Sequence, residues 1–213
     1  MSLEEKILIC DWSGVVSDDR ETVLWAINQV FQEVGGGPIT MNKLCDSYGN
    51  VSDTKKNFGV DITVERFWER YKFFIPKAPK QPVMIHGVDV VLRRLASNNV
   101  RLAVFSAHPQ VELDKEAQRY GVRDLFYVFE GSIKNKTDRI KAFMQEISAS
   151  RDNTFYAGDT TVDIVAGRAA GVVTIGVTTG YHTRARLESA KPDHIIETLE
   201  GVVPIILNHS PRL

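Results

Sequence analysis

The sequence contains only two cysteines among 213 residues, Cys10 and Cys45, and this scarcity excludes a fold held together by several disulfides. Their separation fits no cysteine-rich zinc site, so we expect two reduced thiols. No apolar run approaches the roughly 20 residues of a membrane span. The acidic N-terminus also lacks the basic and apolar regions of a signal peptide. We therefore expect a cytoplasmic protein that does not enter a membrane.

An excess of charge of one sign is also missing. Lysine and arginine total 26 and aspartate and glutamate 27, so the formal net charge is -1. This balance gives no electrostatic case for binding nucleic acid. A chain of this length with 43% hydrophobic residues can bury one good core and carry a small additional unit. A small molecule is therefore the expected partner, and the oligomeric state stays open.

Short apolar segments recur along the chain, and most of them lead into a helical pattern. Six segments are predicted as strands: 6–10, 100–105, 125–129, 153–157, 172–177 and 194–196. Four segments between them show helical periodicity: 87–96, 110–120, 136–147 and 161–170. This alternation predicts an α/β fold with a parallel sheet.

One stretch interrupts the alternation. Between residues 19 and 82 the sequence has no convincing buried strand and instead shows helical patterns at 21–34, 41–48 and 64–74. A Gly-Gly-Gly-Pro run at 35–38 predicts a flexible break, and the proline-rich segment 76–82 predicts a return linker. We expect an α/β core formed by residues 1–18 and 83–213, with a helical cap at 19–82.

Polar side chains follow three of the predicted strands: Asp11, Ser106 and Asp159. In open parallel sheets, ligands bind beyond the carboxyl ends of the strands. A carboxylate there can attack a phosphoryl group and form an aspartyl-phosphate. Asp159 and Asp163 lie one helical turn apart, and Mg²⁺ suits such a group of oxygens. Taken singly, each residue could equally be a helix cap or a turn former.

Four ordered motifs over nearly the whole chain resemble those of the haloacid dehalogenase-like hydrolases. Cys10–Val15 (CDWSGV) resembles the first family motif, in which Asp11 would be the nucleophile. The segment VFSAHP resembles the second, in which Ser106 would be a phosphate ligand. The segment IKNKTDRI is similar to the third family motif, where Lys136 matches the family lysine and Lys134 is a weaker candidate. Gly158–Asp163 (GDTTVD) resembles the fourth family motif.

This resemblance implies a Rossmann-like parallel sheet with helices on both faces, plus a small inserted helical cap. The tail from Ala166 and the position of the insertion are similar to the phosphoglycolate phosphatase-like branch. The resemblance therefore implies a Mg²⁺-dependent hydrolase of small phosphorylated metabolites. It assigns the phosphate to Ser106, Lys136 and backbone N–H groups near Ser13, Gly14 and Ala107, and the metal to Asp11, the Ser13 carbonyl, Asp159 and Asp163.

Ser13 departs from the family pattern, which has a second aspartate at this position for proton transfer. A positioned acid or base contributes about 10²–10⁴-fold, and a serine hydroxyl does not replace it. The expected phosphatase is therefore slow, or its chemistry differs. His108, directly after the Ser106 loop, is one candidate substitute because an imidazole titrates near neutrality. Simple packing of this histidine is the competing interpretation.

The motif Asp11-Trp12-Ser13-Gly14 also resembles that of the phosphonoacetaldehyde hydrolases, which cleave a C–P bond through a cap lysine. In this chain Ser52 follows Gly49 where that lysine is expected, although Lys55 and Lys56 are one helical turn further on. An exposed lysine pair is the competing interpretation of those two residues. A third alternative is a weakly active or non-catalytic descendant that binds phosphorylated molecules.

Overall fold

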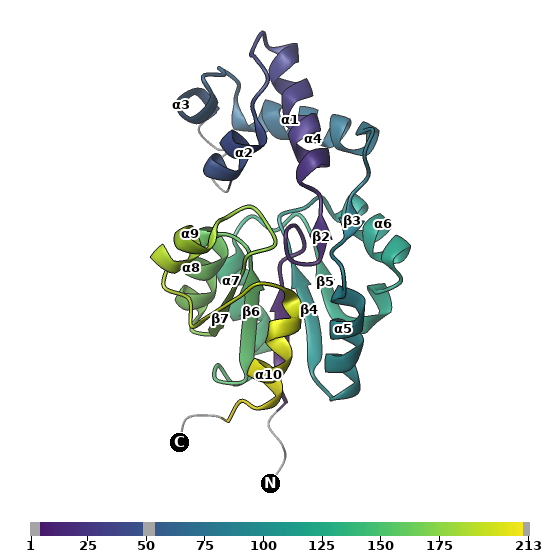
Figure 1. Ribbon diagram of the computed structural model, residues 1–213, viewed down its shortest axis with the longest axis vertical. Coiled ribbons are helices and arrows are strands. Elements are labelled where there is room, and N and C mark those ends of the chain that lie inside the picture. The colour runs from purple at the N-terminus through teal and green to yellow at the C-terminus, as the bar shows by residue number, and fades with distance from the viewer. Residues whose placement is uncertain (1–4, 49–53, 211–213) are drawn as a thin grey trace. The chain divides into compact units, whose positions relative to one another are not determined.

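The computed structural model describes residues 5–48 and 54–210 and divides into two compact units (Figure 1). The first unit takes its residues from 1–17 and 84–213, and the second from 18–83. Two very short strands, β2 (Ser17–Asp18) and β3 (Val83–Met84), pair with each other where the chain passes between the units. The second unit is thus an insertion in the chain of the first.

A parallel sheet of six strands forms the centre of the first unit. The strands are β1 (Ile7–Cys10), β4 (Arg101–Phe105), β5 (Phe126–Glu130), β6 (Thr154–Gly158), β7 (Val173–Val177) and β8 (His194–Ile196). Their order is β5-β4-β1-β6-β7-β8, and every pairing is parallel. All six predicted strands are confirmed to within one residue at each end.

Helices cover both faces of this sheet, because successive apolar residues of its strands point to opposite faces and both faces must be buried. Leu8 and Cys10 belong to one buried cluster, with α5 (Val88–Ser97), α6 (Gln110–Tyr120) and α10 (Val202–Leu207). Ile7 and Ile9 belong to the other, with α7 (Lys136–Glu146) and α8 (Thr161–Ala170). Figure 1 shows α5 and α6 on one side of the sheet and α7 and α8 on the other. The predicted fold class is therefore confirmed.

Shorter elements complete the first unit. Helix α9 (Arg184–Ser189) follows β7, and the 3₁₀ turns η2 (Arg123–Leu125) and η3 (Leu199–Gly201) precede β5 and α10. None of these three was predicted from sequence, because each is too short to show a helical period.

The second unit is helical in the residues that the structure describes, apart from its short β2 and β3 ends. It contains α1 (Arg20–Glu33), α2 (Met41–Ser47), α3 (Thr54–Phe58), α4 (Val64–Phe74) and the 3₁₀ turn η1 (Ile75–Lys77). Its core includes Phe31, whose ring centroid lies 5.3 Å from that of Phe58 and 6.2 Å from that of Phe67. The hydroxyls of Thr40 and Thr63 cap α2 and α4. The three predicted helices are confirmed, whereas α3 was not predicted as a separate helix.

The strand order determines where a ligand site can form. Strand β1 is central, and the chain first builds the sheet outward through β4 and β5, then crosses to β6, β7 and β8 on the other side. Such a reversal opens a crevice at the carboxyl ends of the strands around it. The ends of β4, β1 and β6 lie side by side there, because Cys10 is in register with both Val104 and Ala157.

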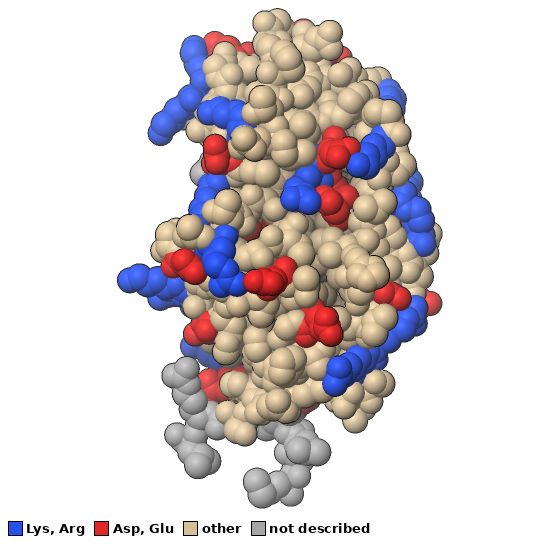
Figure 2. Space-filling model, in the orientation of Figure 1, with Lys and Arg blue, Asp and Glu red and all other residues tan. Residues whose placement is uncertain are grey.

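The surface shows no concentration of one charge on the face drawn in Figure 2, where acidic and basic side chains are interspersed. Among residues 5–48 and 54–210, no helix is long and apolar enough to span a membrane.

Candidate active site

The ends of three adjacent strands carry the side chains that the sequence singled out. Asp11 directly follows β1, and its backbone N–H donates to the Ala157 carbonyl of β6 at 2.9 Å. Ser106 directly follows β4 and donates its backbone N–H to Glu130 of β5 at 3.0 Å. Ligand atoms of Asp11, Asp159 and Asp163 lie within 4.8 Å of one another, and all three residues are buried. The sheet therefore gathers three carboxylates in one place.

Lys136, the first residue of α7, lies between two of these carboxylates. Its Nζ is 2.7 Å from Asp11 Oδ2 and 2.6 Å from Asp163 Oδ1, and its side chain is only 12% exposed. Burial alone would lower the pKa of Lys136, but the charges of Asp11 and Asp163 raise it above its usual value. The lysine is thus held as a cation. Lys134, the weaker candidate, is exposed.

Asp163 is fully engaged by hydrogen bonds. Its Oδ1 accepts from Lys136 Nζ and from the Tyr156 hydroxyl at 2.8 Å, and its Oδ2 accepts from the N–H and the hydroxyl of Thr160. Burial would raise the pKa of Asp163, but Lys136 and these hydroxyl donors lower it. Asp163 also completes a capping box with Thr160 at the start of α8. It is therefore both a helix-capping residue and the anchor of Lys136.

Asp159 has a different environment. Its Oδ2 accepts the Tyr181 N–H at 2.7 Å, whereas its buried Oδ1 has no hydrogen-bond partner within the described part of the chain. Burial raises the pKa of Asp159 well above its usual range, and the charges of Asp163 and Asp11 raise it further. Gly14 and Gly180 pack so closely against this carboxylate that a methyl group on either would overlap Oδ2.

This donor set fits a hard divalent cation such as Mg²⁺. A buried carboxylate oxygen without a partner is rare, because its desolvation is not compensated. A cation beside Asp159 Oδ1 would satisfy it and offset the repulsion from Asp11. Asp159 and Asp11 are the carboxylates best placed to bind a metal directly, since both Asp163 oxygens already accept two hydrogen bonds.

The Asp11 carboxylate is oriented by three neighbours. Its Oδ1 accepts the Trp12 backbone N–H at 2.7 Å, its Oδ2 faces Lys136, and the Ser106 hydroxyl also hydrogen-bonds the group. Burial raises the pKa of Asp11, and this outweighs the lowering by Lys136 and Ser106. The His108 backbone N–H donates to Ser106 Oγ at 3.2 Å, which leaves the hydroxyl hydrogen free to point toward Asp11.

The loop after β1 differs in part from its predicted role. Ser13, two residues after Asp11, is buried. Gly14, however, donates its N–H to the Ser17 carbonyl at 2.8 Å, so this group is not directed at a phosphate oxygen. Its φ of 73° and its close approach to Asp159 explain the glycine instead. Ala107 lies exposed between buried Ser106 and His108.

His108 and Lys55 each face a carboxylate that does not belong to the Asp11, Asp159 and Asp163 cluster. The His108 imidazole faces Glu116 of α6, with Nε2 3.1 Å from Oε1, and is buried. Lys55 and Lys56 lie on α3 in the second unit and are exposed, and Lys55 pairs with Asp61 at 3.0 Å. Gly49 and Ser52, which entered the alternative prediction, lie outside the described residues.

Several residues at the site were not predicted to act there. Tyr156 was seen only as part of a strand, yet its hydroxyl binds Asp163. His182 is buried and accepts the Thr161 N–H through Nδ1 at 2.9 Å, which caps α8. The Thr-x-x-Asp spacing at 160–163 is a capping-box signal that could have been recognised. Sequence spacing gives no signal for Tyr156, because its contact with Asp163 depends on how β6 and α8 pack together.

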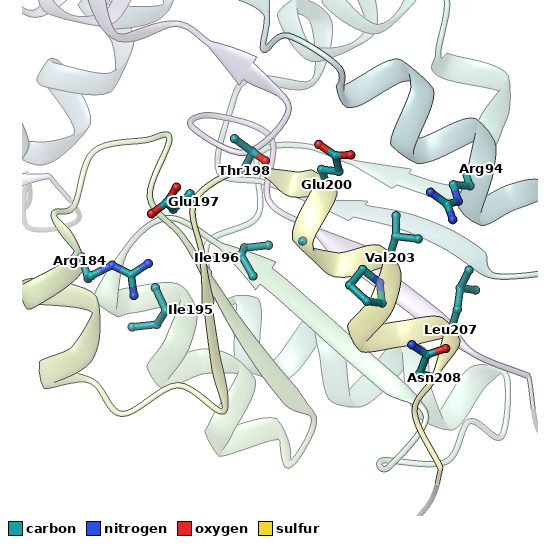
Figure 3. A pocket seen from close by; sticks show the side chains of 12 residues that line it. Arg94, Arg184, Ile195, Ile196, Glu197, Thr198, Glu200, Val203, Leu207 and Asn208 are labelled. Atoms are coloured by element: carbon teal, nitrogen blue, oxygen red, sulfur yellow. The ribbon is translucent and has the colours of Figure 1, made fainter.

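A cavity of about 640 Å³ lies elsewhere on the first unit, beside β8 and α10 (Figure 3). Arg94, Arg184, Ile196 and Glu200 are among its lining residues, and none of the predicted site residues is. It is an open surface depression rather than part of the carboxylate cluster.

Fold and site together define a class, an open parallel α/β enzyme with carboxylates and a lysine at the strand ends. A haloacid dehalogenase-like hydrolase family model matches residues 8–177. The chain therefore belongs to the haloacid dehalogenase-like hydrolases.

Relatives carry phosphatase names. Phosphoglycolate phosphatase of Synechococcus elongatus is 30% identical over 114 residues, which cover 53% of this chain and 54% of that protein. Pyrophosphatase PpaX of Oceanobacillus iheyensis is 24% identical and aligns over 94% of this chain and 96% of its own length. The crystal structure of a predicted phosphatase from Clostridium acetobutylicum has a TM-score of 0.85 at 17% identity, covering 96% and 99% of the two chains. That last likeness shows the fold.

Proposed function

We propose that this protein is a Mg²⁺-dependent phosphatase of small phosphorylated metabolites that works through an aspartyl-phosphate on Asp11. The observation that carries the proposal is the pairing of Asp11 with Lys136 beside Asp159, whose Oδ1 has no hydrogen-bond partner among the described residues. The phosphatase names of the relatives support the substrate class. Phosphoglycolate is the first substrate to test.

Each side chain has a defined task in this proposal. Asp11 attacks phosphorus while the Trp12 N–H holds its Oδ1 and Lys136 holds its Oδ2. Lys136 neutralises the nucleophile and the incoming phosphoryl oxygens, and the Ser106 hydroxyl donates to the same group. Asp163 fixes the position of Lys136. Bound Mg²⁺ would be held by Asp11, Asp159 and the Ser13 carbonyl, with Asp163 in support, and would stabilise charge on the transferring group.

Proton transfer is the weak point of this site. The leaving oxygen needs a proton and the hydrolytic water must lose one, and Ser13 supplies neither function well. We infer that hydrolysis is slow and that substrates with acidic leaving groups react fastest, since they leave without a proton. We also assign substrate selection to the second unit, residues 18–83, acting as a cap.

A substrate panel with and without Mg²⁺ tests the proposal. The panel contains phosphoglycolate, sugar phosphates, pyrophosphate and aryl phosphates of graded leaving-group pKa. The expected result is Mg²⁺-dependent release of phosphate whose rate falls steeply as the leaving-group pKa rises. Binding of phosphate without any turnover would instead indicate a non-catalytic descendant.

Ser13 also favours a second candidate, cleavage of the C–P bond of phosphonoacetaldehyde, because this chemistry requires no second aspartate after the nucleophile. It needs an amine that forms a Schiff base with the aldehyde. Borohydride is added to the protein with phosphonoacetaldehyde, and the labelled peptides are identified. A reduced adduct on Lys55 or Lys56, absent from K55Q and K56Q, would replace the phosphatase proposal, whereas no adduct supports it.

A further inference from the structure

Two loops of the site converge on one buried carboxylate of α6 that has no assigned role. Glu116 is 5% exposed, and its Oε2 accepts the Trp12 indole N–H and the Ser17 hydroxyl, each at 2.8 Å. Its Oε1 lies 3.1 Å from His108 Nε2. Trp12 belongs to the loop after β1, Ser17 begins β2 at the end of that loop, and His108 belongs to the loop after β4.

The same two residues hold the reacting side chains through their backbone. The Trp12 N–H donates to Asp11 Oδ1 at 2.7 Å, and the His108 N–H donates to Ser106 Oγ at 3.2 Å. The Trp12 indole N–H donates to Glu116, and the His108 imidazole lies 3.1 Å from the same carboxylate. One carboxylate is therefore connected, through one residue on each side, to the nucleophile and to the phosphate-binding hydroxyl.

The surroundings of Glu116 make this connection rigid. The Trp12 ring is fully buried, stacks on Tyr120 at 5.8 Å between centroids and meets Phe129 edge-on at 5.4 Å. The Tyr120 hydroxyl also bonds Ser17 Oγ at 2.8 Å. Burial acts to raise the pKa of Glu116, but His108, Trp12 and Ser17 lower it overall. A buried carboxylate with three partners has little freedom to move.

We propose that Glu116 is a positioning residue that clamps the Asp11 loop to the Ser106 loop and so sets the distance between nucleophile and bound phosphoryl group. This inference rests on the proposed function, which makes Asp11 and Ser106 the reacting and binding groups. Its physical basis is that small errors in the placement of reacting groups cost large factors in rate. Glu116 itself touches neither the substrate nor the metal.

The experiment compares E116Q with E112Q, the same change on the same helix. The Glu112 side chain pairs with Lys115 of the same helix at 2.8 Å, and only its backbone N–H reaches the loop after β4, at the Pro109 carbonyl. Single-turnover phosphorylation of Asp11 and steady-state kcat and KM are measured per folded molecule. We expect E116Q to lower the phosphorylation rate and kcat about tenfold with a smaller change in KM, because misplacement acts mainly in the transition state. E112Q should stay within about twofold of the unchanged protein, since it alters only a pair with an exposed lysine of the same helix.

A second variant guards against misfolding. W12F keeps the buried ring but removes the indole donor, so it should lower the phosphorylation rate in the unchanged background and have little further effect in E116Q. Equal rates for E116Q and the unchanged protein would overturn the inference, as would a rate loss of the same size in E112Q. Additive losses in the double variant would overturn it too.

Failure of the proposed function is recognised separately. If the unchanged protein shows no phosphorylation of Asp11, the function is wrong, and the clamp is then tested by NMR. The backbone amide signals of Trp12 and His108 should both shift in E116Q and stay in place in E112Q. A shift confined to one of the two loops would contradict the clamp.

Discussion

A buried cluster of charges in the first unit contrasts with an exposed ion pair in the second. In the first unit, three carboxylates and Lys136 are buried together at the strand ends, with Lys136 between Asp11 and Asp163. In the second unit, Lys55 and Asp61 form an exposed pair, with side-chain exposures of 74% and 83%. Exposed pairs contribute little free energy, whereas buried charges are costly unless they are matched. The difference indicates which charges the protein holds at a cost to stability, and these are the ones we connect with chemistry.

The largest contrast should come from the same substitution in the two units. D11N removes the nucleophile and should lower kcat by at least about 10⁴-fold. D46N, at an exposed position of α2, should leave kcat within about twofold, because it alters only surface charge. Both are measured by phosphate release at saturating substrate and Mg²⁺. Substantial activity in D11N would show that another residue is the nucleophile.

Lysine offers the next comparison. K136M leaves Asp11 and Asp163 as buried charges without their cation, so the free energy of unfolding should fall by about 3–5 kcal/mol. K134Q, two residues earlier and exposed, should change it by less than about 0.5 kcal/mol. Urea unfolding of both variants without Mg²⁺ gives the values. Similar stability of K136M and the unchanged protein would mean that the buried cation does not balance the carboxylates.

Restoring a proton-transfer group should raise activity. S13D places a second carboxylate two residues after the nucleophile and should increase kcat for substrates with poor leaving groups at least about tenfold. It should also lower the melting temperature without Mg²⁺, because it adds another negative charge to the cluster. The check is kcat across the aryl phosphate series. An unchanged slope against leaving-group pKa would indicate that another residue already supplies the proton.

Asp159 should make the metal-free protein sensitive to pH. Because its pKa is raised in the folded state, its contribution to stability is present below the unfolded pKa and is lost as pH rises through the folded value. Mg²⁺ competes with the proton there, so the melting-temperature increase caused by Mg²⁺ should be larger at pH 8 than at pH 5. D159N should raise the metal-free melting temperature at pH 8 by about 2–4 °C and remove the Mg²⁺ effect. A lower melting temperature in D159N would contradict the repulsion described here.

The smallest effect is expected at the exposed pair of the second unit. K55Q removes the partner of Asp61 and should change the free energy of unfolding by less than about 0.5 kcal/mol. Thermal unfolding of K55Q and K136M, measured together, compares the loss of an exposed lysine with the loss of the buried one. A large loss of stability in K55Q would mean that exposed charges matter to stability as much as buried ones.

Much of the first unit could be predicted because its signals are local. Strand β1 is a short apolar run that ends at Asp11, and α8 begins at a threonine with aspartate three residues later. These patterns do not depend on distant residues. The choice of Lys136 over Lys134 came from the motif, and the structure brings Lys136 to the carboxylates.

Most of the remaining features depend on distant partners. Glu116 meets Trp12 across 104 residues and Ser17 across 99, so sequence spacing does not reveal the contact. Asp163 Oδ1 accepts hydrogen bonds from both Tyr156 and Lys136 of neighbouring elements, which makes this residue less available to a metal than Asp159. Gly14 was expected to hold phosphate through its N–H, but the turn to Ser17 uses that group. Tertiary packing decides the first two, whereas the bond from Gly14 to Ser17 is a local turn.

The most direct test of the central claim is to locate the phosphoryl group during turnover. The protein is mixed with a rapidly reacting aryl phosphate and Mg²⁺, quenched in acid, digested and analysed by tandem mass spectrometry. The proposed mechanism predicts one phosphoryl group on Asp11, present only with Mg²⁺ and absent from D11N. Turnover without a phosphorylated Asp11 peptide, or with the group on another residue, would contradict it.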